Sequence, residues 1–338
     1  MRTSVELLPE LVSFSAMAYS TPDRSGDHGG GARLAAISLA FAAIYVIWGS
    51  TYLAIRFAIE TMPPLGMAAV RFLVAGALMY AWLRTRGAPA PTLVQWRSGA
   101  ISGTLLLVGG NGAVVVAEQW VPSGLVALIV ATVPMWMVLL DARFGSGNRP
   151  SSRATMGLMI GFLGVGVLAG SPGVGAGGRE EFLGASLVLV GSISWAIGSL
   201  VSRYVENPPR PAMLVATQML SGGAIFTLLS LASGELVGFS ILDVSQRSWW
   251  ALLYLIIAGA IVGYAAYIWL LTVVLPSRVA TYAYVNPVVA LFLGWALADE
   301  PLIPRSMLAA AIILASVVVI TTDSVQDLRG KPSDSIGL

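Results

Sequence analysis

The stretch TYAYVNPVVALF, residues 281–292, interrupts an apolar segment of the length of a membrane helix with Asn286 and Pro287. Proline has no backbone N–H and disrupts the helical turn before it, so a carbonyl near Ala283 needs another partner. In hydrocarbon that partner must be water, a side chain or a ligand. Pro287 therefore marks either a functional break in the helix or a kink that only shapes packing.

The composition is typical of a membrane protein. The chain has 338 residues, of which 57% are hydrophobic and 11% charged, with a mean hydropathy of +0.81. Its basic residues are scattered, which argues against a nucleic-acid surface. It has no cysteine, and its one histidine, His28, lies in a polar Gly-rich segment, which argues against a metal site or a Ser-His-Asp triad. We therefore expect lipid as a partner, no cofactor, no metal and no enzymatic activity.

Ten segments are long and apolar enough to cross a membrane, since about 20 residues span a hydrocarbon core of about 30 Å. They are residues 34–56, 64–84, 98–118, 122–141, 153–170, 184–204, 211–233, 249–271, 276–298 and 304–322. Cytoplasmic loops are enriched in Lys and Arg. With both termini inside, 14 of the 19 Lys and Arg face the cytoplasm, 4 face outward, and Arg71 remains in a span. The sequence predicts an all-α polytopic membrane protein with ten transmembrane helices and both termini cytoplasmic.

Polar segments divide the chain. Residues 1–33 lack the features of a span and of a signal peptide, so we expect a disordered cytoplasmic tail, with Met17 as an alternative start. The Gly-rich segment 171–183 is an expected external linker, because no strand precedes its G-x-G-x-x-G pattern. The expected domains are a first repeat at 34–170, a second at 184–323 and a cytoplasmic tail at 324–338.

The two units repeat one another in opposite orientations. The aligned pairs are Trp48–Trp195, Arg56–Arg203, Pro64–Pro211 and Gly76–Gly223 at an offset of 147, and Pro134–Pro287 at an offset of 153. Because each unit holds five spans, an odd number, the second copy enters the membrane from the opposite side. Inverted repeats of this kind are common in transporters, which hold the substrate near the midplane between the two halves.

Three stretches resemble the EamA family of the drug/metabolite transporter superfamily. They are IWGSTYLAIR at 47–56, AEQWVPSGLVALIVATVPMW at 117–136 and SRVATYAYVNPVVALFLGWALADEPL at 277–302. The resemblance covers residues 34–323 and implies a ten-span exporter of amino acids and other small metabolites in a bacterial cytoplasmic (inner) membrane. One departure is that Glu300 follows Pro287 by thirteen residues, whereas Gly147 stands at the corresponding place after Pro134.

Polar and aromatic side chains within the spans are the candidate binding residues, because unpaired polar groups are costly there. They are Trp48, Ser50, Tyr52, Arg71, Asn111, Trp195, Tyr264, Tyr267, Tyr284 and Asn286. Arg71 either binds a substrate carboxylate or pairs with Glu118, and its alignment with the neutral Gln218 favours the ion pair. Trp48 and Trp195 fit helix packing and cavity lining equally well. Pro134 and Pro287 are the candidate helix-break or gating positions.

These features predict a secondary transporter that exports small neutral or zwitterionic metabolites, amino acids foremost, by alternating access. No nucleotide-binding motif is present, so the energy comes from a solute or proton gradient, and Glu118 is the candidate proton carrier. The first span lacks a carboxylate, which disfavours multidrug exchange, and the single lysine, Lys331, lies in a tail. The alternatives are another solute or multidrug transporter of this fold, or a membrane-embedded enzyme or scaffold. Either a monomer or a homodimer is compatible with the sequence.

Overall fold

The structure, a computed structural model, describes residues 28–144, 151–169, 178–298 and scattered positions between 304 and 319. All elements in these residues are helical. Seven helical stretches of the described chain are long and apolar enough to cross a membrane, and two shorter ones cover Thr155–Gly164 and Tyr282–Leu297. The shorter stretches fall in the fifth and ninth expected spans, and most of the tenth, 304–322, lies outside the described residues. The chain is thus an all-helical membrane protein, and ten spans stay a prediction.

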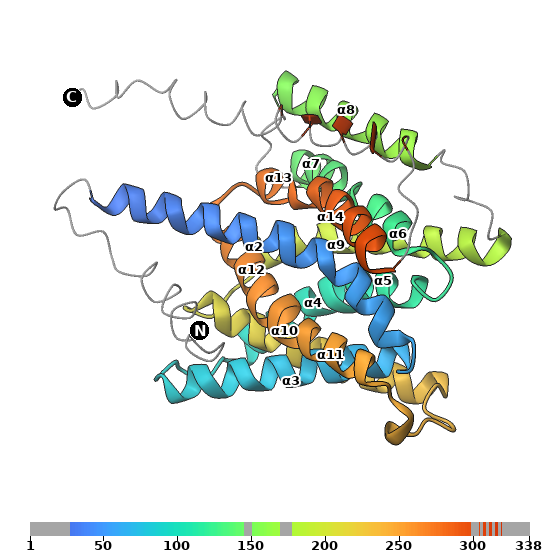
Figure 1. Cartoon of the computed structure of the whole chain (residues 1–338). Helices are drawn as coiled ribbons and strands as arrows, with labels where there is room; N and C mark the ends of the chain where they lie inside the picture. Colours follow the sequence, from blue (N-terminus) through green and yellow to red (C-terminus); the bar gives the residue numbers. More distant parts are fainter. Residues whose placement is uncertain are drawn as a thin grey trace, which may run out of the picture.

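The helices follow the expected spans with several interruptions. In the first half they are α2 (His28–Ile59), α3 (Pro64–Thr85), α4 (Leu93–Gly103), η1 (Thr104–Asn111), α5 (Gly112–Ala117), α6 (Ser123–Val130), α7 (Val133–Phe144) and α8 (Ser152–Ala169). In the second half they are α9 (Gly178–Tyr204), α10 (Pro211–Ser233), η2 (Ile241–Asp243), α11 (Gln246–Tyr254), η3 (Leu255–Tyr264), α12 (Ala265–Val273), α13 (Pro276–Val279) and α14 (Tyr282–Ala298). α2 packs against α14 and against α11 and α12 (Figure 1).

Two helices begin earlier than the hydropathy pattern predicts. α2 starts at His28, inside the expected tail, and residues 1–27 lie outside the described chain. α9 starts at Gly178, inside the expected linker 171–183, of which the first seven residues are not described. Glu180 and Glu181 lie in the first turn of α9, where negative charge is favourable beside the exposed backbone N–H groups.

Local sequence signals fix other helix ends. Pro64 and Pro211 stand in the first turns of α3 and α10, where the missing N–H has no intrahelical partner to lose. The N-terminus of α3 is capped from a distant loop, because the Glu235 carboxylate accepts hydrogen bonds from the backbone N–H groups of Leu65 at 3.2 Å and Gly66 at 2.6 Å. This contact joins the connection after α10 to the start of α3.

The third and eighth spans each contain a π-helical segment. η1 occupies the middle of the stretch from α4 to α5, and η3 the middle of the stretch from α11 to α12. π-Helical turns are rare and occur often at functional sites, since the wider turn shifts the side chains and weakens the regular hydrogen-bond ladder. The two segments therefore single out the central part of both spans.

The two prolines of interest have different local settings. Pro287 lies inside α14, as expected, so it offers no N–H to the Ala283 carbonyl. Pro134 lies within the candidate span Ser123–Asp141, but the helix is interrupted just before it, so its role as a helix-break or gating position stays a prediction. α6 ends at Val130 and α7 begins at Val133, which places Pro134 in the first turn of α7, where a proline is well accommodated.

Glycines bring α3 and α10 into close contact. A Cβ atom on Gly76 would lie 2.9 Å from Met219 Cβ and 3.1 Å from Leu220 Cγ, and one on Gly223 would lie 2.8 Å from Leu73 Cγ. Phe72 stacks on Phe226 beside this crossing, with a ring-centroid distance of 5.9 Å. Side chains larger than hydrogen at either glycine would force the helices apart, so this contact fixes one helix of each half against the other.

Candidate functional site

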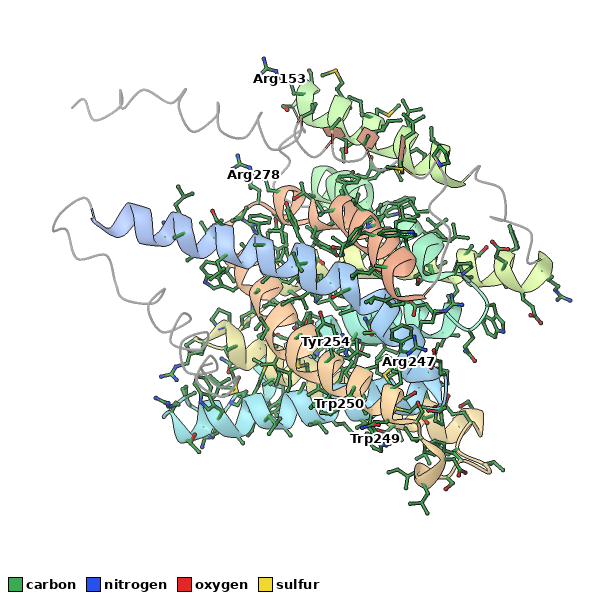
Figure 2. All side chains as sticks on the ribbon, viewed as in Figure 1. Arg153, Arg247, Trp249, Trp250, Tyr254 and Arg278 are labelled. Carbon is green, nitrogen blue, oxygen red and sulfur yellow. The ribbon has the colours of Figure 1, made fainter. Side chains whose placement is uncertain are left out.

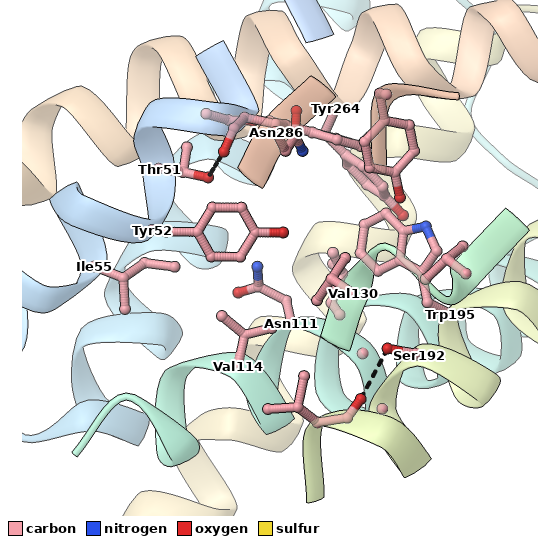
Figure 3. Close-up of a pocket in the computed structure, with 18 of the residues that line it drawn as sticks. Thr51, Tyr52, Ile55, Asn111, Val114, Val130, Ser192, Trp195, Tyr264 and Asn286 are labelled. Carbon is pink, nitrogen blue, oxygen red and sulfur yellow. Dashed lines mark hydrogen bonds between the residues drawn. The ribbon is translucent and has the colours of Figure 1, made fainter. Parts of the chain in front are cut away.

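A central cavity of about 60 Å³ lies among helices of both halves of the chain (Figure 3). Seven of the ten candidate binding residues line it: Trp48, Tyr52, Arg71, Asn111, Trp195, Tyr264 and Asn286. Polar groups converge there in an otherwise apolar wall, which is the usual character of a small-molecule site. Figure 3 shows Tyr52 between Asn111 and Asn286, with its hydroxyl turned toward the interior.

Aromatic rings form one side of the central cavity. Trp48 meets Trp195 edge-on at a centroid distance of 5.5 Å, and Tyr282 edge-on at 4.9 Å. Hydrogen bonds orient both indoles, since Trp48 Nε1 donates to the Gly259 carbonyl at 3.1 Å and Trp195 Nε1 donates to the Tyr267 hydroxyl at 3.0 Å. The two tryptophans both pack against neighbouring helices and line the cavity, so the two roles considered for them coexist.

Arg71 supplies the only charged side chain among the described residues that line the central cavity. It is 3% exposed, and its Nη1 donates to Asn111 Oδ1 at 3.4 Å. Glu118, buried at the end of α5, acts on the guanidinium as a nearby negative charge. Arg71 Nε makes no hydrogen bond within the described chain. The guanidinium therefore retains donor capacity that an anionic group could use, in a setting where unsatisfied donors are costly.

Asn286 has both a structural and a cavity-facing position. With the amide turned so that its nitrogen faces the two neighbouring carbonyls, it donates to the Tyr282 carbonyl at 3.0 Å and to the Tyr45 carbonyl at 3.2 Å, which ties α14 to α2 next to Pro287. The same residue lines the central cavity. Across the cavity, Val130 and Val133 flank the break between α6 and α7 and also line it. The irregular backbone of the fourth span thus borders the cavity.

Three candidates lie elsewhere. Ser50 donates to the Ile47 carbonyl and shares a hydrogen bond with the Tyr254 hydroxyl, so it faces α11. Tyr284 is buried against α8, where its ring would contact a Cβ at Gly161. Tyr267 lies behind the indoles and bonds Ser199 and Trp195.

Thr51, Ser192 and Tyr282 also line the central cavity but are not among the ten candidate binding residues. Helical spacing could have found two of them. Trp48, Thr51, Tyr52 and Ile55 form one face of α2, and Ser192 precedes Trp195 by three residues on α9. By the same helical spacing, Ser50 does not lie on this face of α2.

The model of the EamA-like transporter family matches the chain twice, over residues 34–170 and 182–322. The chain belongs to the EamA family. It is 40% identical over 286 residues to the uncharacterized inner membrane transporter YedA of Escherichia coli K12, which covers 82% of this chain and 88% of that protein. It is 26% identical over 282 residues to a probable amino-acid metabolite efflux pump of Salmonella typhimurium LT2, covering 82% and 91% respectively. A solved crystal structure shares the fold, with a TM-score of 0.67 and 20% identity over 86% of this chain and 98% of that one.

Membership of the EamA family confirms the resemblance read from the three motifs. This EamA protein is a membrane transporter and not an enzyme, and its partners are a lipid bilayer and a small-molecule substrate. The exposed aromatics of α11 suit contact with a bilayer, because Trp and Tyr favour the membrane–water interface. Figure 2 shows Trp249, Trp250 and Tyr254 along α11 near Arg247, and Trp249 and Trp250 are 43% and 63% exposed.

Proposed function

We propose that this EamA transporter exports small neutral or zwitterionic metabolites, amino acids foremost, across a bacterial inner membrane by alternating access. The observation that carries the proposal is the central cavity. It combines a buried guanidinium with spare donors at Arg71, amides at Asn111 and Asn286, and an aromatic wall. A carboxylate suits the guanidinium, and a small organic body suits the rings. The same wall has no carboxylate among its described residues, which disfavours the multidrug alternative.

Reciprocal contacts support two inverted five-helix repeats at 34–170 and 184–323. A Cβ on Gly263 would lie 2.6 Å from Trp48 Nε1, and one on Gly110 would lie 2.7 Å from Trp195 Cε3. The tryptophans are 147 residues apart and the glycines 153, the two offsets of the sequence repeat. Each tryptophan thus contacts the glycine of the other unit that corresponds to the glycine of its own unit. Two units related by a twofold axis form reciprocal contacts of this kind.

The contact between α3 and α10 is reciprocal in the same way. Gly76 meets Leu220 and Gly223 meets Leu73, and both pairs of counterparts are 147 residues apart. The π-helical segments η1 and η3 also occupy equivalent stretches of the two units. Alternating access in such proteins arises when one repeat moves against the other around a central site.

The distribution of arginines supports cytoplasmic termini and an external 171–183 connection. Arg210 Nη1 donates to the Arg86 carbonyl at 3.4 Å, so the connections after α3 and before α10 share one face, which also carries Arg84. The opposite ends of these helices meet where Glu235 caps α3 and where Thr61 donates to Ser248 Oγ at 2.8 Å. The positive-inside rule assigns the arginine-rich face to the cytoplasm. With ten spans, the tails 1–33 and 324–338 lie on that face.

The cavity must widen during transport. Its volume of about 60 Å³ is well below the roughly 300–1,000 Å³ of small-molecule pockets. Pro134 and Pro287 lie beside or within the two interrupted spans, which supports their role as gating positions. Glu118 is the candidate proton carrier if a proton gradient supplies the energy. A monomer and a homodimer are equally compatible with this mechanism.

Flux measurements in proteoliposomes test the proposal. We expect counterflow of labelled neutral amino acids, measured across a substrate panel with and without a pH gradient. Tyr282→Phe and Tyr284→Phe form a matched pair, because they delete the same hydroxyl from neighbouring residues of α14 but only Tyr282 lines the cavity. Tyr282→Phe should change the affinity for the transported solute, and Tyr284→Phe should not. Absence of flux for every neutral or zwitterionic solute would refute the proposed substrate class.

A further inference from the structure

A second cavity, of about 300 Å³, lies between the C-terminal end of α9, the start of α10, and α12. Four of its lining residues are polar or charged, Ser202, Arg203, Asn207 and Thr272, and the other four are apolar. It lies on the arginine-rich face, because Arg203 and Asn207 precede the connection that bonds to Arg86. In this conformation it is larger than the central cavity and within the size range of small-molecule pockets, about 300–1,000 Å³.

The polar lining of the second cavity has groups of both kinds that a zwitterion needs. The Arg203 guanidinium is held beside α12 by a bond from its Nη1 to the Val274 carbonyl at 3.4 Å, and it remains exposed. Asn207 Nδ2 donates to the Ser202 carbonyl at 2.7 Å, whereas Asn207 Oδ1 is buried and accepts no hydrogen bond from the described residues. A carboxylate matches the guanidinium, and an ammonium group matches the unused amide oxygen.

A chain of hydrogen bonds runs from the lining of the central cavity to the lining of the second one. Gln218 is fully buried, and its Oε1 accepts from the Tyr264 hydroxyl at 2.7 Å. Its Nε2 donates to Ser102 Oγ at 2.8 Å and to Ser202 Oγ at 3.1 Å. Tyr264 lines the central cavity and Ser202 lines the second one. A partition made of polar groups can open without burying unsatisfied atoms, because water or a polar solute can replace each bond.

The sequence repeat relates this partition to the opposite end of the central cavity. Gln218 is the counterpart of Arg71 at an offset of 147, and Tyr264 is the counterpart of Asn111 at 153. Both pairs are hydrogen-bonded, since Arg71 Nη1 donates to Asn111 Oδ1 and the Tyr264 hydroxyl donates to Gln218 Oε1. Equivalent positions therefore form equivalent contacts on the two sides of the cavity, as two partitions of an alternating-access site would.

We infer that the second cavity is a binding site for the same small zwitterionic solute, a vestibule on the cytoplasmic side, and that the Gln218 cluster is the partition between it and the central cavity. This inference rests on the proposed function. Arg203 binds the carboxylate, Asn207 Oδ1 accepts from the ammonium group, and rupture of the Tyr264–Gln218–Ser202 chain admits the solute. The alternative role of Gln218 is a structural clamp that only joins α4, α9 and η3 to α10.

Thiol labelling tests the binding site, because the chain has no natural cysteine. Thr272→Cys places a thiol in the second cavity, and Thr85→Cys provides an exposed threonine position at the same face that is not among its lining residues. Alanine is the zwitterionic probe, with ethylamine and propionate as its two separate halves. We expect alanine to slow labelling of Thr272→Cys at least about threefold, with weaker protection by either half because two charge-assisted contacts bind more tightly than one.

Protection should be confined to the second cavity and should depend on its polar lining. Arg203→Gln and Asn207→Leu should each abolish protection of Thr272→Cys by alanine, and Thr85→Cys should react equally with and without alanine. Equal protection of Thr272→Cys and Thr85→Cys by alanine, or protection of neither, would refute the proposed second site.

The partition is tested with a thiol in the central cavity, using Ser192→Cys. A membrane-impermeant reagent applied from the cytoplasmic side of oriented vesicles should react about tenfold faster when Gln218→Ala removes the buried hydrogen bonds that hold the partition closed. Ser202→Ala removes only one hydrogen bond of the Gln218 cluster, that from Gln218 Nε2 to Ser202 Oγ, and should give a smaller increase in the labelling rate. This variant keeps the test informative if Gln218→Ala fails to fold. Lower thermal stability with unchanged labelling in both variants would show a structural clamp.

The labelling and flux experiments test the second site and the export function independently. Normal protection of Thr272→Cys without flux of any neutral or zwitterionic solute would refute the proposed export function and leave the second site. Normal flux without protection would refute the second site and leave the proposed export function.

Discussion

Gly263→Ala tests how tightly Trp48 is confined. The added Cβ would lie 2.6 Å from Trp48 Nε1 and 2.9 Å from Cδ1, closer than nonbonded heavy atoms pack. The indole would have to move by about 1 Å to restore an ordinary contact of roughly 3.5–4 Å. That movement disrupts the 3.1 Å bond from Nε1 to the Gly259 carbonyl. Overpacking costs about 1–3 kcal/mol and an unsatisfied buried carbonyl a further 1–3 kcal/mol, so the free energy of unfolding should fall by about 2–6 kcal/mol.

Two further alanine variants make the comparison specific. Gly110→Ala sets a Cβ 2.7 Å from Trp195 Cε3 and should cost a similar amount, whereas the Cβ of Gly166→Ala on α8 meets no described atom within 4 Å. The last variant should stay within about 0.5 kcal/mol of the parent protein. Denaturant unfolding in detergent measures the stability of all three variants. Counterflow measured at equal protein amount reports whether the displaced indoles still support transport.

Two results would refute this reasoning. Gly263→Ala as stable as Gly166→Ala would mean that Trp48 can move freely, so the cavity wall is not rigid. A large loss in Gly263→Ala without a comparable loss in Gly110→Ala would mean that the two indole contacts are not equivalent, and the argument for a twofold relation between the units would lose its main support.

Three other substitutions probe transport directly. Pro287→Ala supplies an N–H for the Ala283 carbonyl, so it should lower the rate of counterflow more than it lowers folded yield; equal losses would return the proline to a packing role. Arg71→Lys keeps the charge but loses the planar fork, and it should weaken binding of zwitterions by roughly 10-fold, with Arg71→Gln weaker still, as measured by concentration-dependent counterflow. Glu118→Gln should abolish stimulation by a pH gradient while leaving exchange without a gradient; persistent stimulation would exclude Glu118 as the proton carrier.

Much of the helix layout could be predicted from the sequence because its signals are local. Hydropathy and Pro64 set the start of α3, and Pro211 does the same for α10, so both predicted spans match closely. The break before Pro134 could not be located in this way. A proline is tolerated both in the first turn of a helix and, in membrane proteins, inside one, and only the tertiary packing decides between these settings.

The cavity shows a similar limit. Polarity within a span identified most of the polar and aromatic lining residues, since a buried polar group needs a reason to be there. The π-helical segments η1 and η3 carry no sequence signal, because apolar runs such as LIIAGAIVGY fit an α-helix equally well. They decide which way Asn111 and Tyr264 face, and therefore which residues meet across the cavity.

The two ends of the central cavity differ by one charge, and this difference bears on the direction of transport. Arg71 bonds Asn111 with a charged donor, whereas Gln218 and Tyr264 form a neutral bond. The Arg71–Asn111 bond is long, at 3.4 Å against 2.7 Å for Tyr264–Gln218, so a solute carboxylate can replace Asn111 with a shorter, charge-assisted bond to the guanidinium. The neutral end opens without such a replacement, and the larger cavity adjoins that end. In the proposed orientation, a zwitterion that enters from the cytoplasmic side would release the outer partition by binding Arg71, and this would couple the proposed export to occupancy of the site.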